Sequence, residues 1–111
     1  MLALLLATLI QIKPPEYEVV HATVFAYNSE NRQTDEFPAI TASGAYVREG
    51  ALACPERYPF YTIAKIQGRF YMCVDRMAKK YRDKDVFDIW MPSRKQALDF
   101  GKQKLDVIIY P

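Results

Sequence analysis

Short runs of β-branched and aromatic residues, each closed by a turn signal, constrain the fold of this chain more than any other feature. The run V-V-H-A-T-V-F-A-Y at residues 19–27 has the composition of a strand. Segments 61–66 and 69–74 flank Gln67-Gly68, a pattern typical of a tight β-hairpin. Further strands are expected at 51–54, 86–91 and 107–110. The pattern therefore predicts about six short strands.

One short helix is predicted, at residues 94–100. Ser93 and Gln96 form a capping box at its start, and Gly101 is a residue type that commonly ends helices. A chain of 111 residues suffices for one domain only. A sheet of six short strands would leave its edge strands unpaired unless it closes on itself. We therefore predict a single mainly β domain, a small six-stranded barrel, closed or nearly closed, with one short helix near the C-terminus.

The segments that connect the strands are expected to be of two kinds, a tight turn and polar or charged loops. Thr41-Ala42-Ser43-Gly44 is a turn of small residues in which Gly44 supplies an unusual backbone angle. Residues 75–85 are strongly charged and predict an exposed loop, and residues 28–35 predict a polar loop.

The apolar run at residues 1–10 is too short to span a bilayer, which takes about 20 residues. Its length suits the apolar region of a secretory signal that can contact a membrane, with Lys13-Pro14-Pro15 as a stiff spacer. This interpretation divides the chain into an N-terminal segment, 1–15, and a domain, 16–111, of an exported periplasmic or cell-wall protein. In the alternative, the run is a first core strand or a cap on the domain of a cytoplasmic protein.

Cys54 and Cys73 lie nineteen positions apart and belong to no C-x-x-C pair. With His21 as the only histidine, they cannot complete a zinc site, so no metal is expected. In an exported protein they can form one disulfide; otherwise they are two small buried residues.

Charge and motifs exclude several functions. A net charge of +2 gives no basic face for nucleic acid. Phosphate-binding loops, dinucleotide fingerprints, H-E-x-x-H and G-x-S-x-G are all absent. A lone strand histidine such as His21 is more often structural than catalytic.

Carboxylates remain as candidates for catalysis. Asp75 follows Val74 at a strand end, and Asp88 lies between Phe87 and Ile89 within a strand. Desolvation there would raise the pKa of Asp88, as a general acid at neutral pH requires. Alternatively, Asp88 accepts backbone hydrogen bonds or pairs with a basic residue, Arg76 or Lys84.

Aromatic residues near these carboxylates have two interpretations. Trp90 projects on the same strand face as Asp88, and Tyr27, Tyr58 and Tyr81 lie near strand ends or loops. Such rings stack on sugars, but for any single one of them core packing is the more common role.

A series of motifs runs in order through most of the chain: F-A-Y at 25–27, T-D at 34–35, I-T-A-S-G at 40–44, V-D-R-M at 74–77, F-D-I-W-M at 87–91, P-S at 92–93 and A-L-x-F-G at 97–101. Their order and spacing over roughly residues 20–110 resemble those of the three-aspartate (3D) domain. The family includes the catalytic barrel of membrane-bound lytic transglycosylase A. The resemblance implies a double-psi β-barrel.

The resemblance also implies an activity, which is lytic cleavage of the β-1,4 bond between N-acetylmuramic acid and N-acetylglucosamine in peptidoglycan glycan strands, without a cofactor or metal. By this resemblance Asp88 is the general acid and base, and Asp75 supports it electrostatically or positions substrate. The expected substrate-binding residues are Thr41, Ser43, Gly44, Tyr27, Trp90 and Arg76.

The chain departs from the family pattern at three places, one of which is the usual P-x-G-T stretch, here Pro59-Phe60-Tyr61-Thr62. Cys54 occupies the position of a third family aspartate, and D-R-M-A-K-K-Y replaces the usual D-T-G-G-A-I after Asp75. Two alternatives to the enzyme therefore stand. One is a non-catalytic barrel that binds cell-wall glycan or a protein partner. The other is a cytoplasmic adaptor with residues 1–12 folded into its body.

Overall fold

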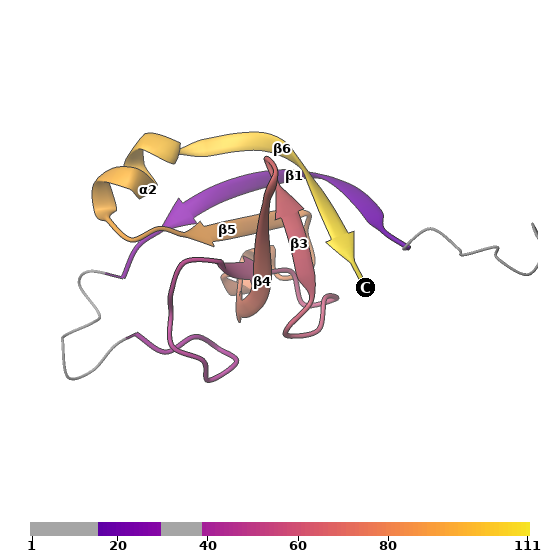
Figure 1. Ribbon diagram of the computed structural model, residues 1–111, viewed down its shortest axis with the longest axis horizontal. Helices are drawn as coiled ribbons and strands as arrows, with labels where there is room; N and C mark the ends of the chain where they lie inside the picture. Colours follow the sequence, from indigo (N-terminus) through magenta and orange to yellow (C-terminus); the bar gives the residue numbers. More distant parts are fainter. Residues whose placement is uncertain (1–15, 30–38) are drawn as a thin grey trace, which may run out of the picture.

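A computed structural model describes residues 16–29 and 39–111 of the chain. The expected signal segment and spacer at 1–15, and most of the polar loop at 28–35, lie outside the described residues. Figure 1 shows the elements in order. They are β1 (Glu18–Tyr27), β2 (Ala51–Cys54), β3 (Ile63–Ile66), β4 (Arg69–Arg76), the 3-10 turn η1 (Lys79–Tyr81), β5 (Val86–Trp90), α2 (Arg94–Phe100) and β6 (Lys102–Tyr110).

The described strands close into a barrel in the order β1-β5-β2-β4-β3-β6. β1 pairs in parallel with β5, and β2 in parallel with β4, whereas the remaining four pairings are antiparallel. Exchanging β1 with β4, β2 with β5 and β3 with β6 reproduces every one of these pairings. The barrel thus consists of two interlocked halves of the same topology, which is the symmetry of a double-psi barrel. The predicted fold is confirmed.

The turn and cap chemistry predicted from the sequence is confirmed. At the tip of the β3–β4 hairpin, Gln67 and Gly68 both have positive φ angles, 50° and 77°. Such turns match the right-handed twist of the paired strands. Ser93 accepts a hydrogen bond from the backbone N–H of Gln96, and Gly101 ends α2 at a φ of 65°. Gly44 has a φ of 91°, as expected.

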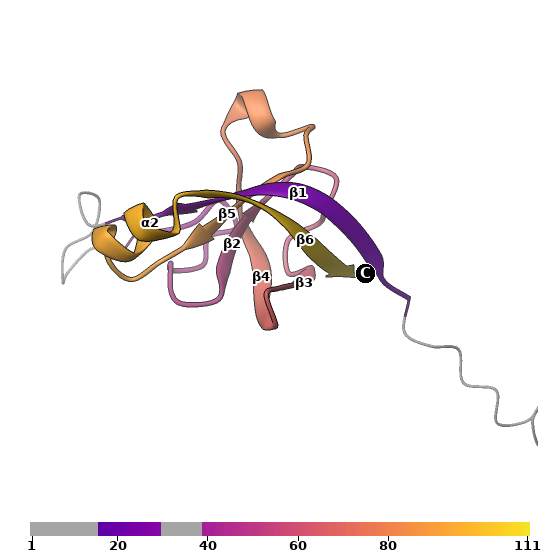
Figure 2. The same cartoon turned by 90° about the horizontal axis from the view of Figure 1, so that it is seen from above.

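Several element boundaries differ from those predicted: β3 begins at Ile63 rather than 61, and β5 ends at Trp90 rather than 91. β6 begins at Lys102 rather than 107 and pairs with β1 from its first residue. Segment 75–85 is not wholly an exposed loop, since Asp75 and Arg76 belong to β4 and Met77 is buried. Its remainder, with η1, projects from the barrel in Figure 2. It is tied down by hydrogen bonds from Arg82 Nε to the Met77 carbonyl (3.2 Å) and from Glu56 N to the Arg82 carbonyl (2.8 Å).

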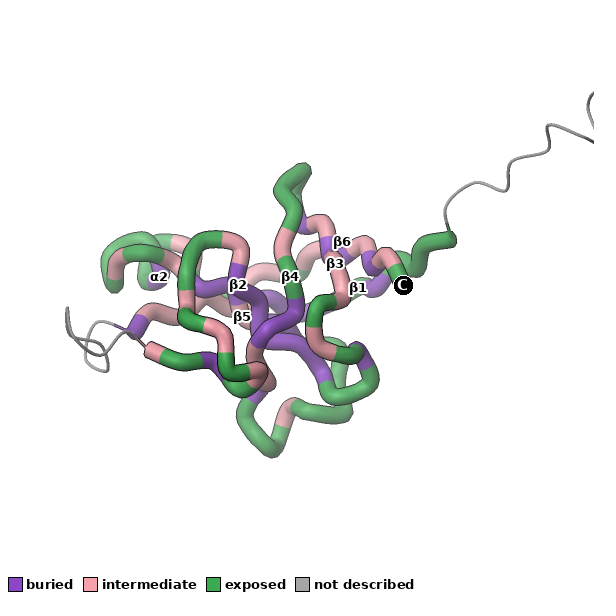
Figure 3. The backbone as a smooth tube through the Cα atoms, turned by 60° about the horizontal axis from the view of Figure 1, so that its bottom comes forward, coloured by how far each residue is buried: buried purple, intermediate pink, exposed green. Residues whose placement is uncertain are grey.

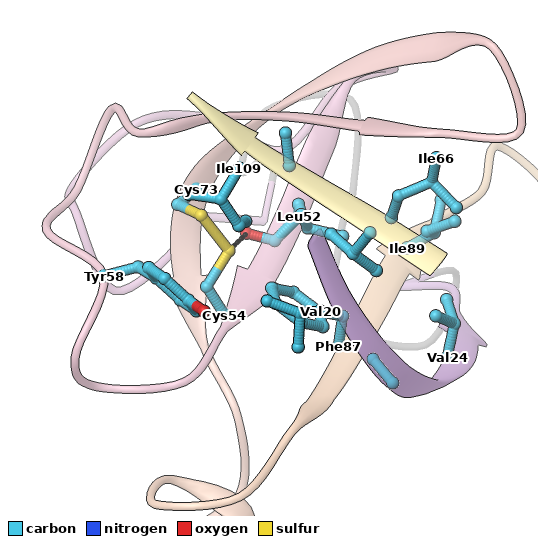
Figure 4. Packing of buried hydrophobic residues seen from close by; sticks show 13 residues of the cluster. Val20, Val24, Leu52, Cys54, Tyr58, Ile66, Cys73, Phe87, Ile89 and Ile109 are labelled. Atoms are coloured by element: carbon cyan, nitrogen blue, oxygen red, sulfur yellow. Dashed lines mark hydrogen bonds between the residues drawn. A yellow bond between two sulfur atoms is a disulfide. The ribbon is translucent and has the colours of Figure 1, made fainter. Parts of the chain in front are cut away.

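The hydrophobic core fills the barrel and contains the disulfide. Cys54 and Cys73 are bonded to one another across β2 and β4, and neither is exposed. Figure 4 shows the bond among the core side chains, and Figure 3 shows β2 as buried backbone. The inward residues that surround it include Val20, Val24, Leu52, Ile66, Phe87, Ile89, Val107 and Ile109. No helix among the described residues is long and apolar enough to cross a membrane.

Candidate active site

Asp88 lies in the middle of β5 on the outer face of the barrel. Phe87 and Ile89 point into the core, so the alternation of a strand turns Asp88 and Trp90 outward, as predicted. Apolar side chains cover much of this outer face on either side of Asp88. One cluster is built on Ala51, Val74 and Trp90, and the other on Ala53, Met77 and Val86. Asp88 is therefore a partly buried carboxyl between two apolar clusters.

Strand register brings Asp75 and Asp88 together. Ala53 of β2 is paired with Asp88 on one side and with Asp75 on the other. An alanine presents only a methyl group, so no large side chain separates the two acids in this row. On its far side Asp88 is paired with Phe25 of β1. The row across four strands is thus Phe25, Asp88, Ala53 and Asp75.

A β-bulge in β4 is what turns Asp75 toward this row. Leu52 pairs with Cys73, but the next residue of β2, Ala53, pairs with Asp75, which leaves Val74 as the extra residue. In an unbroken strand Asp75 would lie on the same face as Cys73, inside the barrel. The bulge instead places Val74 and Asp75 both on the outer face, a use of bulges that is common near functional sites.

Asp75 is held by three hydrogen bonds. Tyr27 Oη donates to its Oδ2 at 3.1 Å, and the backbone N–H groups of Ala42 and Arg76 donate to its Oδ1 at 3.0 and 2.9 Å. The carboxylate therefore links β1, β4 and the 41–44 turn. Of these donors, the Ala42 N–H was not predicted, because a backbone contact from a distant turn leaves no mark in the residue pattern.

The predicted turn lies against the end of β4. The Ser43 N–H donates to the Val74 carbonyl at 3.0 Å, and Thr41 Oγ1 donates to the Ala45 carbonyl at 2.9 Å. The hydroxyls of Thr41 and Ser43 also lie 2.9 Å apart. The turn that contains Thr41, Ser43 and Gly44 therefore lies beside Asp75. The Thr41 hydroxyl is engaged within the turn itself.

Asp88 has a different environment. Its Oδ1 is buried and has no hydrogen-bond partner among the described residues. Desolvation, and secondly the negative charge of Asp75, raise the pKa of Asp88 from 3.8 to about 7. A carboxyl with this pKa exchanges its proton near neutral pH, which suits a group that must act as an acid and then as a base.

The alternatives of pairing Asp88 with Arg76 or Lys84 find no support among the described ion pairs. The Arg76 side chain is engaged elsewhere: its Nη1 donates to the Tyr58 carbonyl at 2.8 Å, and its guanidinium lies 4.1 Å from the centre of the Phe60 ring. The structure therefore brings the backbone N–H of Arg76 to Asp75, but not its guanidinium.

The aromatic candidates serve mainly in packing. Trp90 is only 9% exposed and donates from Nε1 to Ser29 Oγ at 3.1 Å, while Tyr27 is its partner in the strand register. Tyr58 is buried in the core against Phe87 (5.9 Å between ring centres). Tyr81 packs on Phe25 at the margin of the site (6.1 Å). Of these rings, Tyr27 is the one with a hydrogen bond to the acid pair, through Asp75, whereas the Tyr58 hydroxyl donates to Glu18 Oε1 at 3.5 Å.

The remaining titratable candidates lie elsewhere. His21 is exposed and pairs with Asp106 of β6. Cys54 is committed to the disulfide. Among the described residues no three His, Cys, Asp or Glu side chains gather as a metal site would require.

Neither a protein-family model nor a curated protein matches this sequence. The candidate site is therefore defined by its geometry. It is a pair of aspartates on the outer face of a closed barrel, of which one is held by hydrogen bonds and the other is desolvated beside it.

Proposed function

We propose that this chain is a 3D-type barrel that cleaves peptidoglycan glycan strands by lytic transglycosylation, with Asp88 as general acid and base. The observation that carries the proposal is the Asp88 carboxyl, buried at Oδ1 without a partner beside the charge of Asp75, with a pKa of about 7. Groups whose pKa is shifted by burial together with a specific charge are enriched at catalytic sites.

The proposed reaction takes two proton transfers through one residue. Protonated Asp88 donates its proton to the glycosidic oxygen, and the bond from C1 of the muramyl ring to that oxygen breaks. The Asp88 carboxylate then removes the proton from the C6 hydroxyl of the same ring, and O6 bonds to C1. The products are a free N-acetylglucosamine end and a 1,6-anhydromuramyl end, and Asp88 is protonated again.

Asp75 is suited to a supporting part. After desolvation, which is the larger cause, its charge further raises the pKa of Asp88, and the same charge would stabilise positive charge that develops at C1. The hydrogen bonds from Tyr27 and Ala42 fix the carboxylate in place. We also propose export to the cell wall, supported by the disulfide, because such bonds persist mainly in oxidising compartments.

The test is digestion of purified peptidoglycan by the full chain and by Asp88→Asn, with products identified by mass spectrometry. We expect 1,6-anhydromuramyl fragments that disappear in the variant. Fragments with reducing ends would instead indicate hydrolysis, with Asp75 as a second activating carboxylate. If the folded protein sediments with peptidoglycan but releases no fragments, the enzyme proposal is wrong.

One observation favours a second candidate, a barrel that binds the glycan without cutting it. The position of the third family aspartate holds Cys54, which is buried in the disulfide and cannot act as an acid. Sedimentation without fragments in the same experiment is the result that this alternative predicts.

A further inference from the structure

A groove runs along the outer side of β4, from Val74, next to Asp75, toward the β3–β4 hairpin; we call it the β4 groove. It has a volume of about 290 Å³. Its walls come from the loop before β2, from the approach to β3 and from the β3–β4 hairpin. They comprise Ala45, Tyr46, Arg48, Glu49, Gly50, Ala51, Tyr61, Ile63, Phe70, Tyr71, Met72 and Val74.

Three aromatic rings stand exposed on this groove. Tyr46, Tyr61 and Phe70 are 63%, 60% and 62% exposed, and they come from three different segments of the chain. Single exposed apolar residues are ordinary, but a contiguous group of them is characteristic of a binding surface. Rings held in this way offer flat apolar faces, while Arg48 and Glu49 add polar groups to the same wall.

Tyr61 is held in a backbone conformation that tyrosine rarely adopts. Its φ is 74°, in the left-handed region that disfavours bulky side chains. Hydrogen bonds on both sides maintain it: the Tyr61 N–H donates to the Cys73 carbonyl at 2.7 Å, and Thr62 Oγ1 donates to the Pro59 carbonyl at 2.7 Å. A glycine would occupy this position without strain, so the strain is a cost of presenting a ring here, as is often found at functional sites.

The β4 groove is continuous with the candidate active site. Met72 and Val74 line the groove, and the next residue along β4, Asp75, belongs to the acid pair. Ala45, at the same end, directly follows the turn whose Ala42 N–H binds Asp75. From Asp75 to Phe70 the strand extends about 17 Å, so a linear ligand bound at the acids has a path along several aromatic contacts.

We propose that the β4 groove binds the continuation of the glycan strand whose cleavage site lies at Asp88, with sugar rings stacked on Tyr46, Tyr61 and Phe70. This inference rests on the proposed function for the identity of the strand. A linear polysaccharide suits the groove because its rings carry apolar faces with hydroxyl and amide groups at their edges, which matches aromatic walls with a few polar side chains.

Binding measurements test the groove separately from cleavage. Peptide-free glycan strands and, in parallel, stem peptides without glycan would be titrated calorimetrically into full-length Asp88→Asn protein, in which strands stay intact. Tyr46→Ala and Phe70→Ala, made in that background, are each expected to weaken glycan binding about three- to ten-fold. Tyr17→Ala is the matched control, since Tyr17 is equally exposed (60%) but does not line the groove. It is expected to leave binding unchanged.

The outcomes separate the two proposals. If Tyr46→Ala and Phe70→Ala leave the affinity for glycan unchanged, the groove proposal is wrong. It is also wrong if the variants lose affinity for the stem peptides alone, because the groove would then bind peptide. If wild-type protein releases no fragments yet its glycan binding depends on Tyr46 and Phe70, the groove stands and the enzyme proposal fails. If wild-type protein cleaves the strands, but both groove variants bind them as tightly as the Asp88→Asn parent does, the enzyme proposal stands and the groove proposal fails.

Discussion

At Asp75 three donors surround the carboxylate, whereas Asp88 Oδ1 is buried with no partner among the described residues. The two acids share a row on the barrel and differ in what each carboxyl contacts. That difference suits them to the separate tasks of the proposed mechanism, in which the hydrogen-bonded carboxyl is held in place and the desolvated one exchanges a proton.

Replacing Asp75 tests this coupling. Because the charge of Asp75 contributes to the raised pKa of Asp88, Asp75→Asn is expected to lower that pKa from about 7, by up to roughly one unit. Desolvation, the larger cause, remains, so the pKa stays above 3.8. NMR titration of the Asp88 carboxyl measures the shift. Tyr27→Phe, which removes a hydrogen bond from Asp75 but keeps its charge, is the control; an equal shift in both variants would contradict the electrostatic explanation.

The raised pKa also makes stability depend on pH. Between pH 3.8 and about 7 the folded state holds the Asp88 proton more tightly than the unfolded state, so the free energy of unfolding falls as pH rises through this window. Asp88→Asn removes that penalty and is expected to be more stable than wild type at pH 8, by up to about 4 kcal/mol, with little gain at pH 4. Urea unfolding at both pH values measures the difference. Asp83→Asn changes an exposed carboxyl and keeps Asp88, so its difference in stability from wild type should be the same at both pH values.

At the scale of elements, the site depends on how β2 and β4 are joined. The disulfide connects the residue after Ala53 to the residue before the bulge at Val74, so one covalent bond holds both sides of the acid row. It also closes a loop of nineteen residues, and cross-links of this size stabilise a fold by about 3 kcal/mol.

Removing the disulfide should therefore cost stability. We expect the double variant Cys54→Ala/Cys73→Ala to unfold with about 3 kcal/mol less free energy than the oxidised wild type, measured by urea titration. The reduced wild type is the control, since it keeps both side-chain volumes. If reduction changes stability by less than about 0.5 kcal/mol, the bond does not restrain the fold as argued.

Sequence reasoning predicted the elements better than their ends and contacts. Hairpin, helix cap and strand alternation follow from local rules, and all three are confirmed. The start of β6 was missed because the charged residues Lys102, Lys104 and Asp106 point outward and hide the inward alternation of Gln103 and Leu105. The bulge at Val74 was missed for a different reason. It depends on how β4 pairs with β2, a long-range register that no local pattern of residues contains.

At the scale of the whole molecule, closure of the barrel depends on β6. This last strand pairs with β1 along eight residues and with β3 along four, so it joins the two ends of the strand order. Its inward residues Val107 and Ile109 are almost fully buried in the core that contains the disulfide. Loss of packing in β6 should therefore weaken the barrel as one cooperative unit rather than free a single strand.

Ile109→Ala tests this cooperativity. The substitution is expected to cost about 3 kcal/mol because it removes a core side chain and leaves a cavity. In a single cooperative unit, amide hydrogen exchange in β1, β3 and β4 should accelerate by the same factor, although Ile109 lies on none of them. Leu98→Ala, on the exposed side of α2, is the control and should leave exchange in the strands unchanged. Acceleration confined to β6 would mean that the barrel opens strand by strand. The acid pair, held between β2, β4 and β5, would then keep its structure when β6 opens.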